Sequence, residues 1–183
     1  MTTPTDILDF WFSEPVRKDW WGGNPVLDAE IRDRFLGVYA GARDGQHDDW
    51  AETDDGLLAL ILLFDQFPRN MFRGRAEAFA TDPLALALAR FAVENGLDRD
   101  YPAERRHFLY MPFMHSEAIE DQEACVALFS DLGDADTLDF ARRHHDVVAR
   151  FGRFPHRNAA LGQESTAEET EFIATDPRLL MER

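Results

Sequence analysis

A helical spacing of apolar residues recurs along this chain and constrains its fold more than any other feature. In the clearest example, apolar residues follow Asn24-Pro25 mostly three or four positions apart and so share one face of a helix. They are Leu27, Ile31, Phe35, Val38 and Tyr39. The alternation of apolar and polar residues that is typical of strands does not recur. The sequence therefore predicts an all-α fold.

Prolines and glycines indicate where these helices begin and end. Asn24-Pro25 and Asp82-Pro83 each place a capping side chain before a proline, which is favoured in the first turn of a helix. Gly152 is expected to stop a helix over residues 136–151. No linker rich in Ser, Gly or Pro divides the chain. We therefore expect about eight helices joined by short loops, in one domain over residues 1–183.

Two further helix boundaries are predicted from local signals. The apolar run over residues 57–64 predicts a helix that is buried on most sides, and Pro68 is expected to end it. Near the other end of the chain, Ser165 and Glu168 have the spacing of a capping box, which predicts the start of a last helix.

Charge and cysteine content narrow the classes of function. The net charge of −16 repels the phosphates of nucleic acids and anionic lipid headgroups, so neither a nucleic acid nor a membrane is an expected partner. Cys125 is the only cysteine and is expected in the core, so no internal disulfide is required. The first residues have no basic region or long apolar stretch of a signal peptide. We therefore expect a cytoplasmic protein.

The first cluster of polar residues that could bind a ligand or take part in catalysis covers residues 65–74. Its side chains Arg69, Asn70 and Arg73 alternate with large aromatic residues, whose burial would draw the guanidinium groups out of water. A buried guanidinium requires a carboxylate, a phosphate or several carbonyls. The cluster is therefore either a clamp for an anionic ligand or a structural network in which Asp65 and other acids pair with the arginines.

The second cluster covers residues 110–117. His115 and Glu117 are close in sequence, and a histidine oriented by a carboxylate is suited to general acid–base chemistry. The alternative is a histidine that is hydrogen-bonded in the core. The chain lacks the His-Glu-x-x-His and Cys-x-x-Cys spacings of common metal sites, so we predict no metal ligands.

The third cluster covers residues 150–158 and interleaves basic and aromatic side chains. Arg153, His156, Arg157 and Asn158 could line a small anion-binding pocket, or the arginines could cap the ends of helices. His144 belongs to the preceding helical stripe and faces the core, where an imidazole needs a partner. It is either a satisfied core residue or part of the same site.

These segments, in this order, resemble the bacterial family named domain of unknown function 924. The matching segments are Asp9-Phe10-Trp11-Phe12, Asp65 to Asn70 with Phe72-Arg73-Gly74, Tyr110 to Glu117, and Arg150 to Asn158 with Leu161-Gly162 and Ser165-Thr166. The resemblance spans nearly the whole chain. It implies a tetratricopeptide-like array, in which antiparallel helix pairs stack into a superhelix, and it implies no activity. Gln163 departs from the pattern, since a basic residue is expected there.

Two functions of different classes remain open. In the first, the clusters form a pocket for a small anionic ligand, a phosphate or a carboxylate, in which His115, Glu117 and His156 could carry acid–base catalysis. The ligand-binding residues would be Arg69, Asn70, Arg73, His144, Arg153, Arg157 and Asn158. In the alternative, the chain is a tetratricopeptide-like module that binds a peptide or protein without catalysis. The clusters could also serve only to pin helices together. The sequence identifies no cofactor and no oligomeric state.

Overall fold

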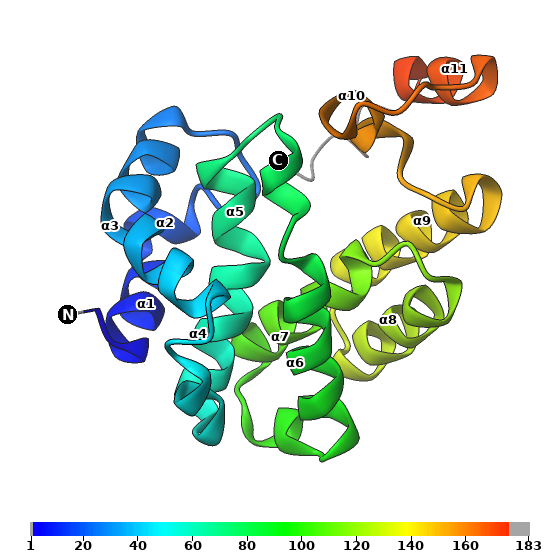
Figure 1. Cartoon of the computed structure of the whole chain (residues 1–183). Helices are drawn as coiled ribbons and strands as arrows, with labels where there is room; N and C mark the ends of the chain where they lie inside the picture. Colours follow the sequence, from blue (N-terminus) through cyan, green and yellow to red (C-terminus); the bar gives the residue numbers. More distant parts are fainter. Residues whose placement is uncertain (1, 176–183) are drawn as a thin grey trace. The chain divides into compact units, whose positions relative to one another are not determined.

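The computed structural model describes residues 2–175, which are built from helices and the loops between them (Figure 1). No strand occurs in this range, so the predicted all-α class is confirmed. Within the same range, no helix is both long and apolar enough to cross a membrane. Contacts divide the chain into two compact units, with unit 1 ending at Asp100 and unit 2 beginning at Tyr101. The expectation of one domain over residues 1–183 stays a prediction.

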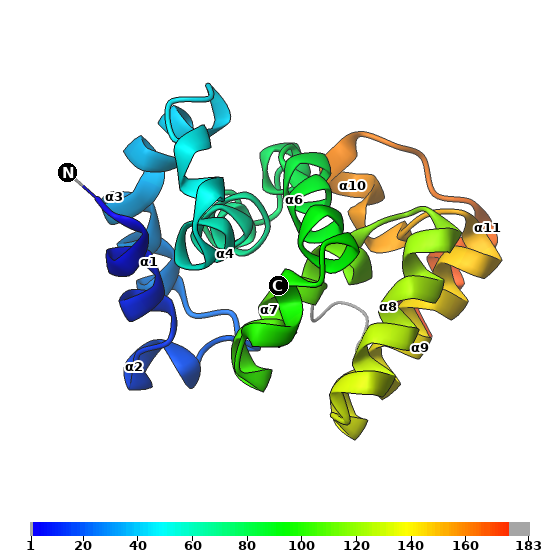
Figure 2. The ribbon, with the colours of Figure 1, turned by 90° about the horizontal axis from the view of Figure 1, so that it is seen from below.

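Unit 1 is organised around its most apolar helix. Its α-helices are α1 (Pro4–Trp11), α2 (Glu14–Arg17), α3 (Pro25–Arg43), α4 (Asp54–Phe64), α5 (Gln66–Met71) and α6 (Asp82–Glu94). Its 3-10 helices are η1 (Asp48–Glu52), η2 (Ala76–Phe79) and η3 (Leu97–Asp100). Helix α4 contacts α1, α3, α5 and α6, and Figure 2 shows it between α1 and α6. Every residue of α4 from Gly56 to Phe64 is buried, as the apolar run predicts.

Unit 2 is organised around a helical hairpin. It contains α7 (Ala103–His115), α8 (Ile119–Leu132), α9 (Ala135–Phe151), η4 (Pro155–Arg157), α10 (Asn158–Leu161) and α11 (Ala167–Thr175). Only Gly133 and Asp134 separate α8 from α9, so the two helices run antiparallel and side by side (Figure 2). Gly133 has φ 77°, a left-handed conformation that favours glycine. The hairpin is one antiparallel pair, while the stacking of pairs into a superhelix stays a prediction.

Most helix boundaries follow from the local signals, although the predicted cap by Asp82 is wrong, because α6 begins at Asp82 itself and its carboxylate accepts from Arg69. The Asn24 side chain accepts a hydrogen bond from the amide of Val26 at 3.0 Å, and α3 begins at Pro25. Gly152 has φ 69° and ends α9.

Two further boundary predictions are wrong. Helix α4 ends at Phe64, and Pro68 lies in the first turn of α5, where its missing N–H has no intrahelical acceptor to lose. The last helix is capped by Thr166 and Glu169 instead of Ser165 and Glu168. The Glu169 amide donates to Thr166 Oγ1 at 3.1 Å, and the Thr166 amide donates to Glu169 Oε2 at 2.7 Å. This shift of one residue turns Glu169 toward Arg153.

Candidate functional site

In unit 1, the structure buries Arg69 and surrounds it with acids. The side chain is 6% exposed, and its Nη1 and Nη2 donate to Asp82 Oδ1 and Oδ2 at 2.9 and 3.0 Å. Nη1 also lies 3.4 Å from Asp65 Oδ1 and donates to the Asp65 carbonyl at 2.6 Å. A buried charge is costly unless it is paired and hydrogen-bonded, and these contacts supply the pairing. Arg69 therefore ties α5 to the start of α6.

The other two candidates of the first cluster share one aspartate. Arg73 donates from Nε and Nη2 to the two carboxylate oxygens of Asp28, each at 2.8 Å. Asn70 Nδ2 donates to Asp28 Oδ1 at 2.8 Å. Because Asp28 lies in the first turn of α3, these bonds join α3 to α5. This is the structural network that the sequence left open, and a ligand-binding role for Arg69, Asn70 and Arg73 stays a prediction.

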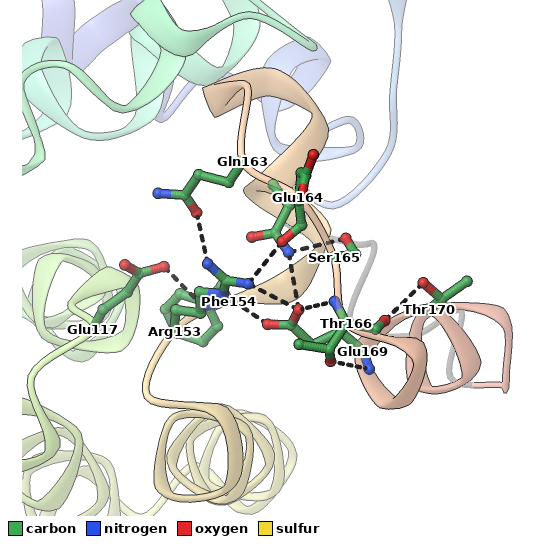
Figure 3. A network of polar contacts seen from close by, with 10 residues as sticks. Glu117, Arg153, Phe154, Gln163, Glu164, Ser165, Thr166, Glu169 and Thr170 are labelled. Atoms are coloured by element: carbon green, nitrogen blue, oxygen red, sulfur yellow. Dashed lines mark hydrogen bonds and ion pairs between the residues drawn. The ribbon is translucent and has the colours of Figure 1, made fainter.

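In unit 2, the second and third clusters meet through Glu117. This residue lies in the loop between α7 and α8 and is exposed. Its Oε1 accepts a hydrogen bond from the backbone amide of Phe154 at 2.8 Å (Figure 3). The contact spans 37 residues of sequence and fixes the carboxylate at the exit of α9. His115 is buried in the last turn of α7, and its orientation by Glu117 stays a prediction.

Phe154 is the centre around which the candidate residues of unit 2 gather. Its side chain is fully buried. The ring centroid lies 5.5 Å from that of His144 and 5.7 Å from that of His156, and the guanidinium carbon of Arg157 lies 4.6 Å from it. His144 donates from Nδ1 to the Phe140 carbonyl at 2.9 Å, which sets its place on α9. We call Glu117, His144, Phe154, His156 and Arg157 the Phe154 site.

A second set of donors lies beside the Phe154 site and holds a carboxylate (Figure 3). Arg153 donates from Nε to Glu169 Oε1 at 2.7 Å and from Nη2 to Oε2 at 2.9 Å. Asn158 donates from Nδ2 to Ser165 Oγ at 3.0 Å and to Glu169 Oε2 at 3.4 Å. The hydrogen bonds from Arg153, together with the Thr166 amide, lower the pKa of Glu169 to about 2. The same pairing raises the pKa of Arg153.

Asn158 leaves one polar atom of this set unmatched. The residue is 1% exposed, and its Oδ1 finds no hydrogen-bond donor among residues 2–175. Most buried polar atoms have a partner, so this oxygen can accept from a ligand a bond that the groups of residues 2–175 do not supply.

Burial shifts the pKa of two other titratable residues of unit 2. Burial lowers the pKa of His107 to about 4, although Asp134 Oδ2 lies 3.7 Å from its Nδ1 and acts in the opposite direction. Burial raises the pKa of Cys125, which keeps the thiol protonated and agrees with the predicted core position. No group of three or more His, Cys, Asp or Glu residues that could hold a metal ion occurs within residues 2–175.

Comparison with known proteins places the chain among its relatives. Residues 7–176 match the family described as bacterial protein of unknown function (DUF924). The chain belongs to this family. A solved structure, titled a protein of unknown function from Agrobacterium tumefaciens, is 40% identical to it with a TM-score of 0.89. The match covers 94% of this chain and 97% of that chain. Among curated proteins, no match is found.

In this DUF924 protein the structure brings most of the predicted site residues of unit 2 together, while three others lie in unit 1. Six of them come together at one end of unit 2, namely Glu117, His144, Arg153, His156, Arg157 and Asn158. Arg69, Asn70 and Arg73 belong to unit 1. Sequence reasoning missed the acids that hold these side chains, Asp28, Asp82 and Glu169. The spacing of Thr166 and Glu169 as a capping box was the one local signal that could have pointed to Glu169.

Proposed function

We propose that this DUF924 protein binds a small anionic ligand, a phosphate or a carboxylate, at the Phe154 site of unit 2. One observation carries the proposal. Residues that the sequence singled out separately meet at the buried Phe154, because side chains from α9 and η4 pack against its ring and Glu117, in the loop after α7, binds its backbone amide. The first cluster contributes less support, because Asp28, Asp65 and Asp82 already balance its arginines.

Arg157 is the group that would hold the anion. Its side chain is buried and lies over the face of the Phe154 ring, where the guanidinium gains a cation–π interaction. A guanidinium has five N–H donors in a planar fork, so it can bind a phosphate or carboxylate in addition to other acceptors. In a partly dehydrated site the attraction between unlike charges is stronger than in water.

Proton transfer would fall to the groups of the site that reach solvent. His156 is partly exposed beside Phe154, and the Glu117 carboxylate is exposed and held by one backbone amide. Imidazole and carboxylate together can accept and donate protons near neutral pH. Binding coupled to proton transfer is therefore the chemistry that we propose, without a named reaction.

The alternative of a tetratricopeptide-like interaction module is favoured by one feature of α6. Leu84 and Phe91 are seven residues apart, share a face of this helix, and are 42% and 48% exposed. Two exposed apolar side chains on one helix are fewer than an extended peptide groove requires. We therefore place the ligand-binding proposal first.

A thermal-shift screen with inorganic phosphate and small carboxylates tests the proposal. A ligand that binds only the folded protein raises the melting temperature by mass action. We expect this rise in the wild type, its loss in Arg157→Gln, and its retention in Arg143→Gln. Arg143 is a matched control, because it lies on α9 in the same unit but pairs with the exposed Asp139 one turn away. If no anion raises the melting temperature, or if Arg157→Gln responds like the wild type, the proposal fails.

A further inference from the structure

The donors around Glu169 are those of an anion-binding site. The carboxylate accepts from Arg153 Nε and Nη2, from Asn158 Nδ2 and from the Thr166 amide, at 2.7, 2.9, 3.4 and 2.7 Å. An arginine fork, a side-chain amide and a backbone N–H are the groups that proteins use to hold phosphates and carboxylates. The side chain of Glu169 is 2% exposed, so it fills the space between these donors.

We infer that Glu169 is a built-in occupant of the anion site, and that α11 is a cover which an anionic ligand displaces when it takes Arg153. This inference rests on the proposed function, because it requires an anion that reaches the Phe154 site. Arg153 follows Gly152 and directly precedes Phe154, and its side chain is 30% exposed. An entering anion can therefore reach it from solvent, and unlike the more exposed Arg150 it lies next to Phe154 in the chain.

The attachments of α11 are consistent with a displaceable cover. The helix has nine residues, and an isolated helix of that length is unstable in water. Glu168 pairs with Arg150, but both side chains are more than half exposed, and such pairs contribute little. Phe172 packs against Phe151 with ring centroids 5.0 Å apart, at the edge of the cluster that contains Phe154. The bonds of Glu169 are thus the polar contacts that hold α11 most firmly.

Asn158 indicates the chemical class of ligand that would displace Glu169. Its Oδ1 needs a donor, and an ionised carboxylate such as Glu169 has none to offer. An anion that also carries a hydroxyl hydrogen, such as hydrogen phosphate or a hydroxycarboxylate, can accept from Arg153 and donate to Asn158. Such a ligand would satisfy the buried oxygen that the protein's own acid leaves without a donor.

Hydrogen exchange with inorganic phosphate as the probe tests the displacement. In the wild type, we expect saturating phosphate to accelerate exchange of the α11 amides, because the bound anion displaces Glu169 from Arg153. In Glu169→Gln, we expect fast exchange without phosphate and a phosphate Kd lower by roughly tenfold or more, since a tethered competitor acts at an effective concentration of about millimolar. Glu168→Gln is the matched control, because it removes the neighbouring charge of the same helix and should change neither quantity appreciably.

The outcomes separate this inference from the proposed function. If phosphate binds the wild type through Arg157 but protects α11 or leaves its exchange unchanged, the displacement is wrong and the proposed function stands. If phosphate binds Glu169→Gln and not the wild type, the inference that Glu169 occupies the anion site is supported. The proposal that the wild type binds an anion at the Phe154 site then fails. If phosphate binds none of the proteins, both ideas fail. Glu169→Asp, which keeps the charge but shortens the side chain, provides an intermediate case should the glutamine variant not fold.

Discussion

After α4 the chain makes a short helical turn that buries Phe67 and Arg69, and after α9 it makes another that buries Phe154 and Arg157. In both turns a proline follows the aromatic residue and lies in the first turn of the new helix. The two segments differ in the acids around them. In unit 1 the acids come from the long helices α3 and α6 and from the junction of α4 with α5. In unit 2 the short helix α11 supplies Glu169, which pairs with Arg153, and Glu168, which pairs with Arg150.

The difference shows that arginines in similar local sequences can have different roles, depending on the acids that pair with them. An aspartate on a long helix whose apolar face packs in the core cannot leave its arginine without disturbing the unit. A glutamate on a helix of nine residues can leave if α11 detaches from α9. The acid partners of the first-cluster arginines thus favour a structural role for them, whereas the acid that holds Arg153 lies on a short helix that a competing anion could displace.

Removing Arg69 is the change with the largest expected effect on this comparison. In Arg69→Ala, the buried Asp65 and the partly buried Asp82 lose their shared cation. Breaking a buried ion pair by deleting one partner costs about 3–5 kcal/mol, because it leaves an uncompensated charge. Chemical denaturation should therefore show a free energy of unfolding lower by this amount.

The control for this variant is an arginine whose ion pair is exposed to solvent. Arg34 pairs with Glu30 one turn away, and both side chains are nearly half exposed. We expect Arg34→Ala to change the free energy of unfolding by less than about 1 kcal/mol. Equal effects of the two substitutions would mean that the first cluster is not held by its acids, and the contrast between the clusters would be lost.

The sequence predicts the helices better than their partners. The end of α9 follows from Gly152, because a glycine stop is a local signal. Pro68 was misplaced because a proline after a helix and a proline in the first turn of the next one give the same pattern. The break itself occurs at Asp65, where no glycine or proline marks it.

An acid titration should destabilise unit 2, which contains the buried His107, and so provides a second comparison of the two units. The pKa of His107 is lowered to about 4 in the fold, against 6.5 for an ordinary histidine, so the unfolded chain binds the proton first. The stability from neutral His107 is complete above pH 6.5 and is lost as the pH falls toward 4, by the order of 3 kcal/mol. Denaturation followed by circular dichroism at several pH values in this window should show the decline.

The tryptophans give this titration an internal reference. All four, Trp11, Trp20, Trp21 and Trp50, lie in unit 1, so tryptophan fluorescence reports on that unit. Acid should therefore reduce the helical signal before it alters the fluorescence. His107→Gln should weaken the pH dependence between 6.5 and 4, while the contribution of Glu169 appears only below about 4.5. A decline of the same size in His107→Gln would show that other groups cause it.

The candidate site was predictable in its residues and not in their pairing. Arg157 and Glu117 stood out because basic, acidic and aromatic residues alternate around them. Asp28 is 45 positions from Arg73, and Asp82 is 13 positions from Arg69. Which acid meets which arginine depends on how the helices pack, and no local pattern contains that information. The shift of the last cap from Ser165 to Thr166 had the largest consequence, because it decides that Glu169 and not Glu168 faces Arg153.

The substitution with the smallest expected effect on the free energy of unfolding is Glu168→Gln, next to Glu169 in the chain. Glu168 accepts from Arg150 Nη2 at 2.6 Å, but the two side chains are 61% and 52% exposed, so water and salt screen the pair. Glu168→Gln should lower the free energy of unfolding by no more than about 0.5 kcal/mol, and added salt should reduce even this difference. Denaturation at low and high ionic strength measures both. A loss well above 1 kcal/mol that salt leaves unchanged would mean that α11 is anchored by more than Glu169, and a cover so anchored could not yield to a competing anion.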